Sequence, residues 1–509
     1  MSGLSRERVA TALVALAAGL GGVGGSYAVV GPTPAFVVSP VARTLTDVMP
    51  GQIIAFMIAH FGSLGQQFNF LAATVLTIVG LGVLAAVGIA VGRRVGTAAF
   101  AVATTVGGCW LVAAILTGTV IASAGTGLAS GIVVGLAEAG RYDLGGESTP
   151  TDRRRVVVST LTALGLGSLG IATGGINNLS PIEHESVDAT TNPGGQTDET
   201  KRSVAELKQL AEERSLDFRS IEPLLSNNHY IVDIDSIDPT VDRSSWTLSV
   251  TGEVEDELEF DFEELRQLPA ENRFVTLRCV GDLLDGREID TAIWTGVPVS
   301  EILDRASPTG DCNCVMLRAA DGYYEEFPLS ALEDGLLAFG MNGQTLPRAH
   351  GYPLRALVPG HWGEVNVKWL TEIELLSREQ EGYWEKKGWH GTGPVTTVAK
   401  LWNGRGQDGI VHHDDGTIEL AGHAYAGTRG IERVEVSTDG GDTWTEAKLT
   451  EPLPGEDVWR QWTHTYDSPG QKHQVVVRAV DGTGTLQPAE RRSAYPNGAT
   501  GWVRKTVKP

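Results

Sequence analysis

Residues 98–137 form a run of 40 residues without a charged side chain. A helix needs about 20 mainly apolar residues to cross the hydrocarbon core of a bilayer, so this run is long enough for two spans with a turn near Ser123. Three further segments are apolar enough to span, at residues 9–29, 70–91 and 156–176. We therefore predict a transmembrane anchor of about five helices over residues 1–176.

The basic residues predict the orientation of this anchor, because cytoplasmic loops of membrane proteins collect Lys and Arg. With the N-terminus inside, every basic residue of the anchor except Arg43 falls on the cytoplasmic side: Arg6, Arg8, Arg93, Arg94, Arg141 and residues 153–155. The rest of the chain is then extracytoplasmic, and the protein is a multi-pass protein of the cell membrane. Residues 151–157 also resemble an internal twin-arginine export signal, which is an equal alternative to a positively charged end of the last helix.

The anchor offers little redox chemistry of its own. Residues 51–61 are predicted to form an interfacial or re-entrant segment, and they contain His60, the only histidine in residues 1–176. A haem-b carrier needs paired axial histidines within the bundle. The sequence therefore favours an anchor rather than an intramembrane electron carrier.

Charge is distributed unevenly along the chain. Residues 1–176 carry 6 acidic and 9 basic side chains, whereas residues 177–509 carry 56 acidic and 31 basic ones. This acidic surface excludes a nucleic-acid binder, which needs basic groups to displace counterions from phosphate. Only 10 of the 40 basic residues are Lys, and acid excess with scarce Lys suggests a halophilic source, where salt screens the repulsion. Four cysteines exclude a disulfide-stapled scaffold.

Composition divides the rest of the chain into a polar linker and two domains. Residues 177–224 read as a solvated tether with a short helix around 204–211. Residues 225–393 mix helices at 262–267 and 299–305 with strands at 274–280, 314–319 and 354–358, which favours an α+β domain. Residues 394–509 alternate polar and apolar positions in short strands, for example at 417–425, 431–437 and 473–480. That pattern predicts an immunoglobulin-like β-sandwich.

Two kinds of cysteine lie in the soluble part. Cys279 ends a β-prone segment and enters a polar loop, so its thiolate could ligate a soft metal, but a free cysteine is more often buried packing. Cys312 and Cys314 are too few for a closed zinc site, which needs four ligands, and a packing role is expected for them.

Several separated motifs resemble the sulfite oxidase family of molybdenum enzymes. The densest is MNGQTLPRAHGYPLRALVPG at residues 341–360. Three shorter motifs follow the order and spacing of the same family, namely RCV at 278–280, WTGVP at 294–298 and DGYY at 321–324. GHAY at 422–425 and VEVSTDGGDTW at 434–444 resemble the family's C-terminal dimerisation domain. The resemblance covers roughly residues 225–509.

The resemblance implies a molybdopterin cofactor with molybdenum in the central domain and a homodimer through the C-terminal domain. Cys279 matches the position whose sulfur ligates the metal. His350 and Arg355 match residues that contact the pterin and its phosphate, and Lys368 matches a further pterin-side contact. Arg suits a dianionic phosphate because its guanidinium donates paired, charge-assisted hydrogen bonds. Tyr383 lies near the position where the family places a catalytic tyrosine.

Two departures from the family pattern concern the substrate. The sulfite oxidase segment CxGNRR, whose Arg helps to bind the anion, reads CVGDLL at residues 279–284. We align the family's Arg-Asn-His segment with residues 232–235, again without Arg. A site lined by Asp282 or Asp233 would repel a dianion, and we therefore expect a substrate other than sulfite.

These observations predict a membrane-anchored extracytoplasmic oxidoreductase that transfers an oxygen atom to or from a small substrate while molybdenum cycles between Mo(VI) and Mo(IV). Neither a Cys-x-x-Cys-His haem motif nor an iron–sulfur cysteine set occurs, so an external carrier is required, such as a cytochrome, a blue-copper protein or a quinone. One alternative is a reductase of S- or N-oxides or of methionine sulfoxide, supplied by the quinone pool. A second is a non-catalytic cell-surface binding module.

Overall fold

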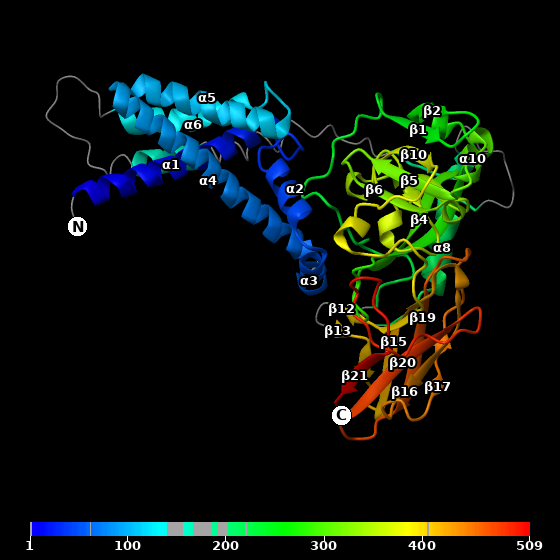
Figure 1. The fold of residues 1–509 in the computed structure, drawn as a ribbon. Helices are drawn as coiled ribbons and strands as arrows, with labels where there is room; N and C mark the ends of the chain where they lie inside the picture. The colour runs from blue at the N-terminus through cyan, green and yellow to red at the C-terminus, as the bar shows by residue number, and fades with distance from the viewer. Residues whose placement is uncertain are drawn as a thin grey trace. The chain divides into compact units, whose positions relative to one another are not determined.

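The structure, a computed structural model, describes residues 3–61, 63–139, 156–165, 185–191, 202–218, 221–404 and 407–508. The chain divides into two compact units (Figure 1). The helical unit comprises Met1–Met49, Ser63–Pro181 and Asp233–Thr240, and the second unit comprises Pro50–Gly62, Ile182–Val232 and Val241–Pro509. The bounds of the four segments expected from the sequence stay a prediction.

The helical unit is built from long apolar helices that pack closely. Its elements are α1 (Gly3–Val30), α2 (Ser39–Val48), α4 (Ser63–Val95), α5 (Ala98–Thr117), α6 (Ala124–Glu138) and a short helix at Val156–Gly165. α1 packs against α4 and α6, and α5 packs against the same two helices. Small residues allow this: a Cβ atom added to Gly25 of α1 would lie 2.3 Å from the carbonyl oxygen of Gly125 in α6. Such contacts between small residues are typical of membrane helix pairs.

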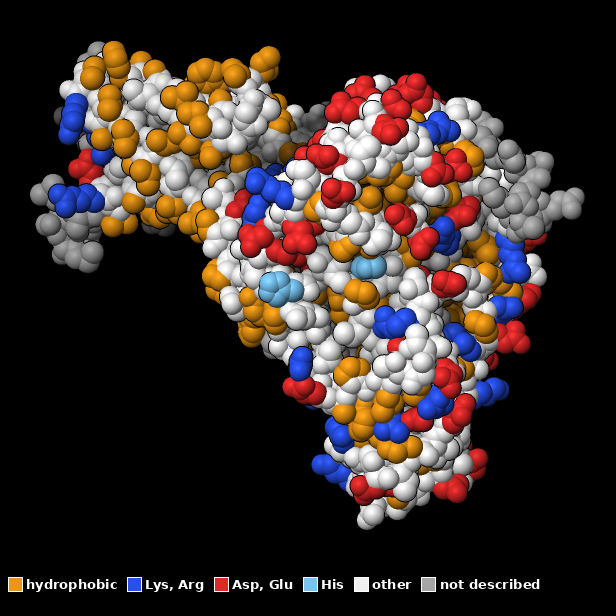
Figure 2. All heavy atoms as spheres, turned by 45° about the vertical axis from the view of Figure 1, so that its right-hand side comes forward, with side chains coloured by type: hydrophobic (Ala, Val, Ile, Leu, Met, Phe, Trp, Pro, Cys, Tyr) orange, Lys and Arg blue, Asp and Glu red, His pale blue; other side chains and the backbone are white. Residues whose placement is uncertain are grey.

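Three of these helices are long and apolar enough to cross a membrane, at Glu7–Val30, Gly65–Val95 and Ala98–Thr117. Ala124–Glu138 and Val156–Gly165 are apolar but shorter. The helices expose large apolar side chains, such as Val83 (57%), Leu111 (53%) and Ile115 (72%), and Figure 2 shows them over the visible face of this unit. Five spans stay a prediction, because residues 140–155 and 166–176 lie outside the described part of the chain.

The helix α3 (Gly51–Phe61) belongs to the second unit, although α2 and α4 flank it in sequence. Gln52 donates a hydrogen bond from Nε2 to the Tyr495 hydroxyl at 3.2 Å. Gly51 is close to the backbone of Lys387, since a Cβ atom there would lie 2.2 Å from that carbonyl oxygen. The side chain of His60 lies outside the described residues. The predicted interfacial segment is thus a helix that contacts the second unit.

Two sheets form the central part of the second unit. One has the order β2-β1-β10-β5-β6, in which only β1 and β10 are parallel, and the other has the order β3-β4-β7-β8 with β9 paired to β7. Their facing sides share one core, in which Val250, Leu317 and Ile373 pack with Val297, Leu337 and Ala356. The strands are β1 (Thr247–Gly252), β2 (Leu258–Asp261), β3 (Glu271–Arg278), β4 (Ile289–Pro298), β5 (Cys314–Ala319), β6 (Tyr324–Pro328), β7 (Leu336–Met341), β8 (Gln344–Thr345), β9 (Arg355–Leu357) and β10 (Leu370–Leu376).

Short helices complete this part, namely α8 (Val204–Arg214), α9 (Phe262–Arg266), α10 (Ser300–Ala306) and α11 (Leu329–Leu332). Sequence patterns located α8, α9 and α10 to within a few residues, because capping residues and apolar periodicity mark them. The Ser203 hydroxyl accepts a hydrogen bond from the Glu206 amide, and the Glu206 carboxylate accepts one from the Ser203 amide, which forms a complete capping box at the start of α8.

The C-terminal part consists of two larger antiparallel sheets and a small two-stranded sheet, β12-β13. One has the order β11-β15-β19-β18 with β14 beside β15, and the other has the order β17-β16-β20-β21. Ile418, Leu420 and Trp462 of the first sheet share a core with Val434, Val436 and Val477 of the second. The strands are β11 (Val398–Leu401), β12 (Asn403–Gly404), β13 (Gln407–Asp408), β14 (Ile410–His412), β15 (Thr417–Tyr425), β16 (Ile431–Ser437), β17 (Thr445–Glu446), β18 (Lys448–Leu449), β19 (Arg460–Asp467), β20 (His473–Asp481) and β21 (Val503–Val507). The two sheets agree with the expected β architecture, and its immunoglobulin type stays a prediction.

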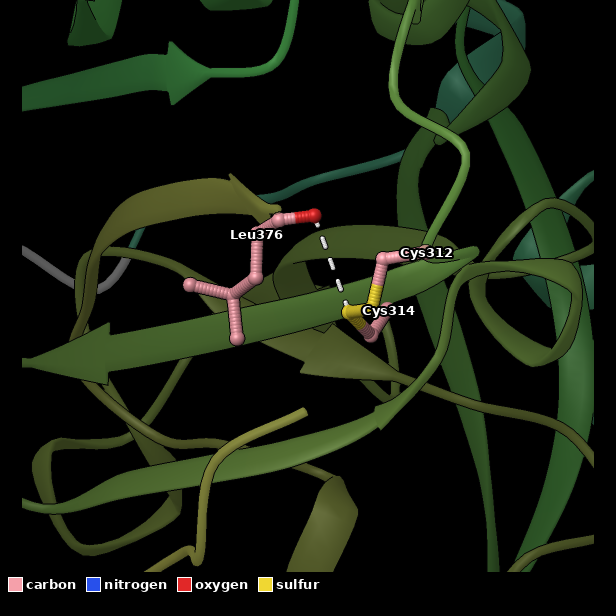
Figure 3. Close-up of a disulfide and its surroundings, with 3 residues drawn as sticks. All are labelled: Cys312, Cys314 and Leu376. Atoms are coloured by element: carbon pink, nitrogen blue, oxygen red, sulfur yellow. Dashed lines mark hydrogen bonds between the residues drawn. A yellow bond between two sulfur atoms is a disulfide. The ribbon is translucent and has the colours of Figure 1, made fainter. Parts of the chain in front are cut away.

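Cys312 and Cys314 form a disulfide at the start of β5 (Figure 3). The Cys314 sulfur also lies 3.6 Å from the carbonyl oxygen of Leu376 on the neighbouring β10. The intervening Asn313 has φ 53°, in the left-handed region that Asn tolerates better than most residues. The sequence predicted packing at this position and did not predict the bond.

The contact between α1 and α6 predicts that Gly25→Leu destabilises the helical unit, because the larger side chain has no space beside Gly125. Overpacking of this kind costs about 1–3 kcal/mol. A lower melting temperature of the detergent-solubilised protein, measured by circular dichroism, is expected. The matched control is Gly80→Leu in α4, where a Cβ atom meets nothing within 4 Å. Equal losses in both variants would contradict the packing described here.

Candidate active site

Cys279 follows the last residue of β3 and begins a tight loop toward β4. Its amide donates to the carbonyl oxygen of Glu288 at 2.9 Å, and its own carbonyl oxygen accepts from the Asp282 amide at 3.0 Å. The thiol is free and buried, and burial raises its pKa well above the usual value. A thiolate at this position therefore needs a bound cation to stabilise it. The rigid loop suits a metal ligand.

A buried group of three charged side chains holds this loop in place. Asp282 accepts from Arg278 Nε at 2.8 Å and from Lys400 Nζ at the same carboxylate oxygen. Lys400, on β11, also donates to the carbonyl oxygen of Gly286 at 3.0 Å. Burial alone would raise the pKa of Asp282, but Lys400 and Arg278 outweigh burial and lower it. The C-terminal sheets thus contribute directly to the shape of the Cys279 loop.

This arrangement corrects the expectation that Asp282 repels a dianion, because two cations compensate its charge. The second carboxylate of that argument, Asp233, lies in the segment Asp233–Thr240 of the helical unit. Neither residue therefore supports the exclusion of sulfite. The separate argument from the absence of Arg in residues 279–284 is unaffected.

The structure brings His350, Arg355 and Lys368 together, as the sequence predicted. His350 ends the short helix η3 (Arg348–His350), and Arg355 begins β9. Arg355 Nη1 donates to the His350 carbonyl oxygen at 3.5 Å, and its guanidinium lies 5.4 Å from the centre of the Trp294 ring. Lys368 Nζ donates to the carbonyl oxygen of Ala349 at 3.0 Å. One short stretch of chain therefore gathers all three side chains.

Two residues that sequence reasoning missed join this group. The His229 ring lies 5.3 Å from the His350 ring and 5.7 Å from Trp294. The Tyr230 hydroxyl approaches Gly363, where a Cβ atom would lie 2.7 Å from it and 3.5 Å from the Cys279 Cα. Tyr230 therefore connects the Cys279 loop to the cations. The motif Asn-Asn-His at 227–229 was the available signal, a few residues before the segment expected to correspond to Arg-Asn-His.

The electrostatics of these cations favour an anion. Burial lowers the pKa of Lys368 to about 7 and that of Arg355 to about 10, and burial with Arg355 lowers the pKa of His350 to about 4. Among the described residues, no carboxylate forms an ion pair with Arg355, and its buried Nε atom has no hydrogen-bond partner. The buried Nε2 of His229 also has none. Buried cations are stabilised by a bound anion, and a phosphate meets this need.

Tyr383 is buried against other aromatic rings, with its centre 5.7 Å from Tyr323 and 5.1 Å from Trp384. The hydroxyl that reaches the backbone beside Gly363 is that of Tyr323, which lies 2.9 Å from the carbonyl oxygen of Glu364. A catalytic role for Tyr383 stays a prediction. Tyr323 lies in the DGYY motif at 321–324, which the sequence had singled out without assigning a role to it.

Comparison with known proteins agrees with this site. Residues 235–384 match the oxidoreductase molybdopterin binding domain, and residues 399–503 match the Mo-co oxidoreductase dimerisation domain. Sulfite oxidase of Arabidopsis thaliana is 29% identical over 50% of this chain and 80% of its own length. Mitochondrial sulfite oxidase of Mus musculus is 30% identical over 49% of this chain and 54% of its own length. An NADH nitrate reductase of Brassica napus is 29% identical over 51% of this chain and 35% of its own length.

Among solved structures, the sulfane dehydrogenase SoxCD from Paracoccus pantotrophus matches with a TM-score of 0.49 and 22% identity, over 57% of this chain and 82% of that one. The sequence matches and the site together define a molybdopterin-dependent oxidoreductase. Within that class, the chain belongs to the sulfite oxidase family and carries its C-terminal dimerisation domain. Its cofactor is molybdopterin with molybdenum.

The residues present fit this cofactor. The unpartnered Nε of Arg355 is a buried donor, which suits the phosphate of the cofactor. Nε2 of the neutral His229 ring is a buried acceptor, because its Nδ1 donates to the Tyr230 carbonyl oxygen at 3.2 Å, and it suits an N–H group of the pterin. Cys279 offers a thiolate ligand on a loop fixed by Arg278, Asp282 and Lys400. The geometry therefore provides a ligand for the metal and a binding site for the pterin and its phosphate.

The pKa of Lys368 predicts that anion binding takes up a proton. With a pKa of about 7 in the free site, Lys368 is charged below pH 7, and a bound anion raises its pKa. We expect the affinity of the cofactor-free protein for sulfate, which does not titrate in this range, to be flat below pH 7 and to fall by about tenfold per pH unit above it. Calorimetry of Lys368→Met should show no such dependence, whereas the exposed-site control Lys386→Met should retain it. A flat profile in the unmodified protein would contradict the assignment.

Proposed function

We propose that this protein is a membrane-anchored extracytoplasmic molybdenum oxidoreductase that transfers an oxygen atom between water and a small substrate. The observation that carries the proposal is the pairing of the buried Cys279 thiol with the buried Arg355 guanidinium, which has no carboxylate partner among the described residues, and with the neutral His350 ring beside it. Two electrons leave in each turnover to an external carrier, such as a cytochrome, a blue-copper protein or a quinone.

Each part of the site has a distinct task in this proposal. When bound, the cofactor supplies the two-electron oxygen-transfer chemistry. Cys279 would ligate the molybdenum, and His350, Arg355 and Lys368 would bind the pterin and its phosphate. Arg278 and Lys400 keep the Cys279 loop in position through Asp282. The protein thus orients the cofactor and fixes its charge balance.

The substrate is a small oxygen acceptor. The absence of Arg at residues 279–284 favours a substrate other than sulfite, but the charge of Asp282 no longer adds to this argument. A second candidate is a reductase of S- or N-oxides or of methionine sulfoxide, supplied by membrane quinol. The contact of α3 with Tyr495 favours this second candidate. α3 is apolar and lies in sequence between helices of the proposed anchor, yet it contacts the catalytic unit.

Replacement of Cys279 tests the function. In Cys279→Ser we expect turnover to fall by roughly 100-fold or more, since even outer partners of a metal site contribute about 10–100-fold. Molybdenum and pterin content, turnover with sulfite, and oxidation of a reduced dye by sulfoxides should be measured together. Cys109→Ser, in α5, is the matched control. Full turnover of Cys279→Ser at full molybdenum occupancy would refute the proposal.

The disulfide supports an extracytoplasmic site, because disulfides persist mainly in oxidising compartments. The helices that are long enough to span, with Arg93 and Arg94 in the last turn of α4, are compatible with the proposed anchor and its orientation. The matched dimerisation domain supports a homodimer through the C-terminal sheets. A halophilic source stays a hypothesis from the acidic composition.

The location predicts accessibility of the disulfide from outside the cell. After mild reduction of intact cells, a membrane-impermeant maleimide should label Cys312 or Cys314, and Cys312→Ser/Cys314→Ser should remove the label. Labelling that appears only after the cells are lysed would place the catalytic unit in the cytoplasm.

A further inference from the structure

Three carboxyl groups are buried together beside the candidate active site. Glu325 lies on β6 and is 0% exposed, Glu364 lies in the short helix η4 (Gly363–Val365) and is 8% exposed, and Glu385 begins the short helix η5 (Glu385–Lys387). Five of their six carboxylate oxygens are buried without a hydrogen-bond partner in the described structure. Such groups are costly to bury as charges. Their arrangement therefore requires a compensating positive charge, such as a bound proton.

The geometry shows that two of these carboxyl groups converge. A Cβ atom added to Gly382 would lie 1.5 Å from Glu325 Oε1 and 2.5 Å from Glu385 Oε2. The remaining oxygen of Glu325, Oε2, accepts from the Tyr323 hydroxyl at 2.8 Å. That hydroxyl lies 2.9 Å from the carbonyl oxygen of Glu364. Tyr323 therefore connects the Glu325–Glu385 pair to the backbone beside the Cys279 loop.

The charges around the pair favour protonation. Burial raises the pKa of Glu325, Glu385 and Glu364 raise it further, and only the hydrogen bond from Tyr323 lowers it among the main influences. Burial and Glu385 raise the pKa of Glu364 to about 8. The cations of this region contact other groups: Lys386 Nζ donates to the Tyr324 hydroxyl at 2.8 Å, and Lys387 Nζ lies 5.0 Å from the Tyr383 ring centre. Two adjacent buried carboxyl groups cannot both ionise at low cost.

The group extends from the active site toward solvent. At its inner end, Gly363 approaches both Cys279 and Tyr230. At its outer end, Glu385 is partly exposed and raises the pKa of Glu326, which burial and neighbouring carboxylates bring to about 7. A proton held by the pair therefore has a second protonatable carboxyl group, Glu326, on the solvent side.

We propose that Glu325 and Glu385 share a proton and, with Tyr323, form the proton store of the oxygen-transfer reaction. The inference rests on the proposed function. Oxidation of a substrate S follows S + H2O → SO + 2H+ + 2e−. A new S–O bond forms, both O–H bonds of water break, and the two electrons pass to a one-electron carrier in two steps. The carboxylate pair receives a released proton through Tyr323 and passes it from Glu385 toward Glu326 on the solvent side. A reductase would use the same route in reverse.

Infrared spectroscopy of the full-length holoenzyme tests the store without turnover. Near pH 7, several protonated buried carboxyl groups, Glu364 among them, contribute to the carbonyl stretch. The component of the Glu325–Glu385 pair should be lost in Glu325→Gln and is seen as a difference band between the unmodified protein and this variant. Glu259→Gln, at an exposed position on β2, should leave the band unchanged. Glu385→Gln is a second variant at a partly exposed position, in case Glu325→Gln folds poorly. No band, or the same band in all proteins, would overturn the proposal.

Two further measurements separate the possible failures. Molybdenum content should be unchanged in Glu325→Gln, while turnover falls by about 100-fold and its pH profile shifts, the usual scale for a lost proton-transfer group. Unchanged turnover and pH profile would overturn the proton store. If calcium or magnesium chloride binds stoichiometrically and abolishes the band, the group is a cation site and the proposal is wrong. An unmodified protein that has the band but lacks any oxygen-transfer activity would refute the proposed function instead.

Discussion

The bond between Asp282 and its two cations is the interaction on which the active site depends. Asp282 and Arg278 belong to the loop and strand around Cys279, whereas Lys400 comes from the C-terminal sheets. Removal of one partner from a buried group of this kind is costly, because the others stay charged without compensation. The Cys279 loop and the C-terminal sheets are therefore coupled in energy. The coupling joins the two matched domains, because Asp282 lies within residues 235–384 and Lys400 within residues 399–503.

Charge also organises the site. Cations gather where the pterin phosphate is expected, and protonatable carboxyl groups gather on the side of Tyr323. Burial shifts the pKa values of both sets. It lowers the pKa of Lys368, so that binding of an anion is accompanied by proton uptake, and it raises the pKa of Glu364, so that the neutral acid is favoured. Gly363 lies between the two regions, close to Cys279 and Tyr230. A single backbone segment thus separates the anion site from the proton store.

The sequence predicted the residues whose type and local spacing are distinctive. Cys279, His350, Arg355 and Lys368 lie within compact motifs, and β5, β15 and β16 follow from alternating patterns. It failed where a partner is distant along the chain. The charge of Asp282 was misjudged because Lys400 lies 118 residues away, and His229 was missed because its neighbour His350 is on another element. The placement of α3 in the second unit likewise depends on tertiary structure. The Cys312–Cys314 disulfide is local, with a sequence separation of 2, and it was missed because the pair was interpreted as packing.

The path of the chain has a consequence for how the enzyme is held. α3 belongs to the catalytic unit although α2 and α4 belong to the helical one. Conversely, the segment Asp233–Thr240 belongs to the helical unit although the residues on either side of it belong to the catalytic unit. The polypeptide therefore passes between the two units several times, rather than through one stalk. A protease that cuts a single connection would leave the others intact, and shedding of a free catalytic fragment would require several independent cleavages.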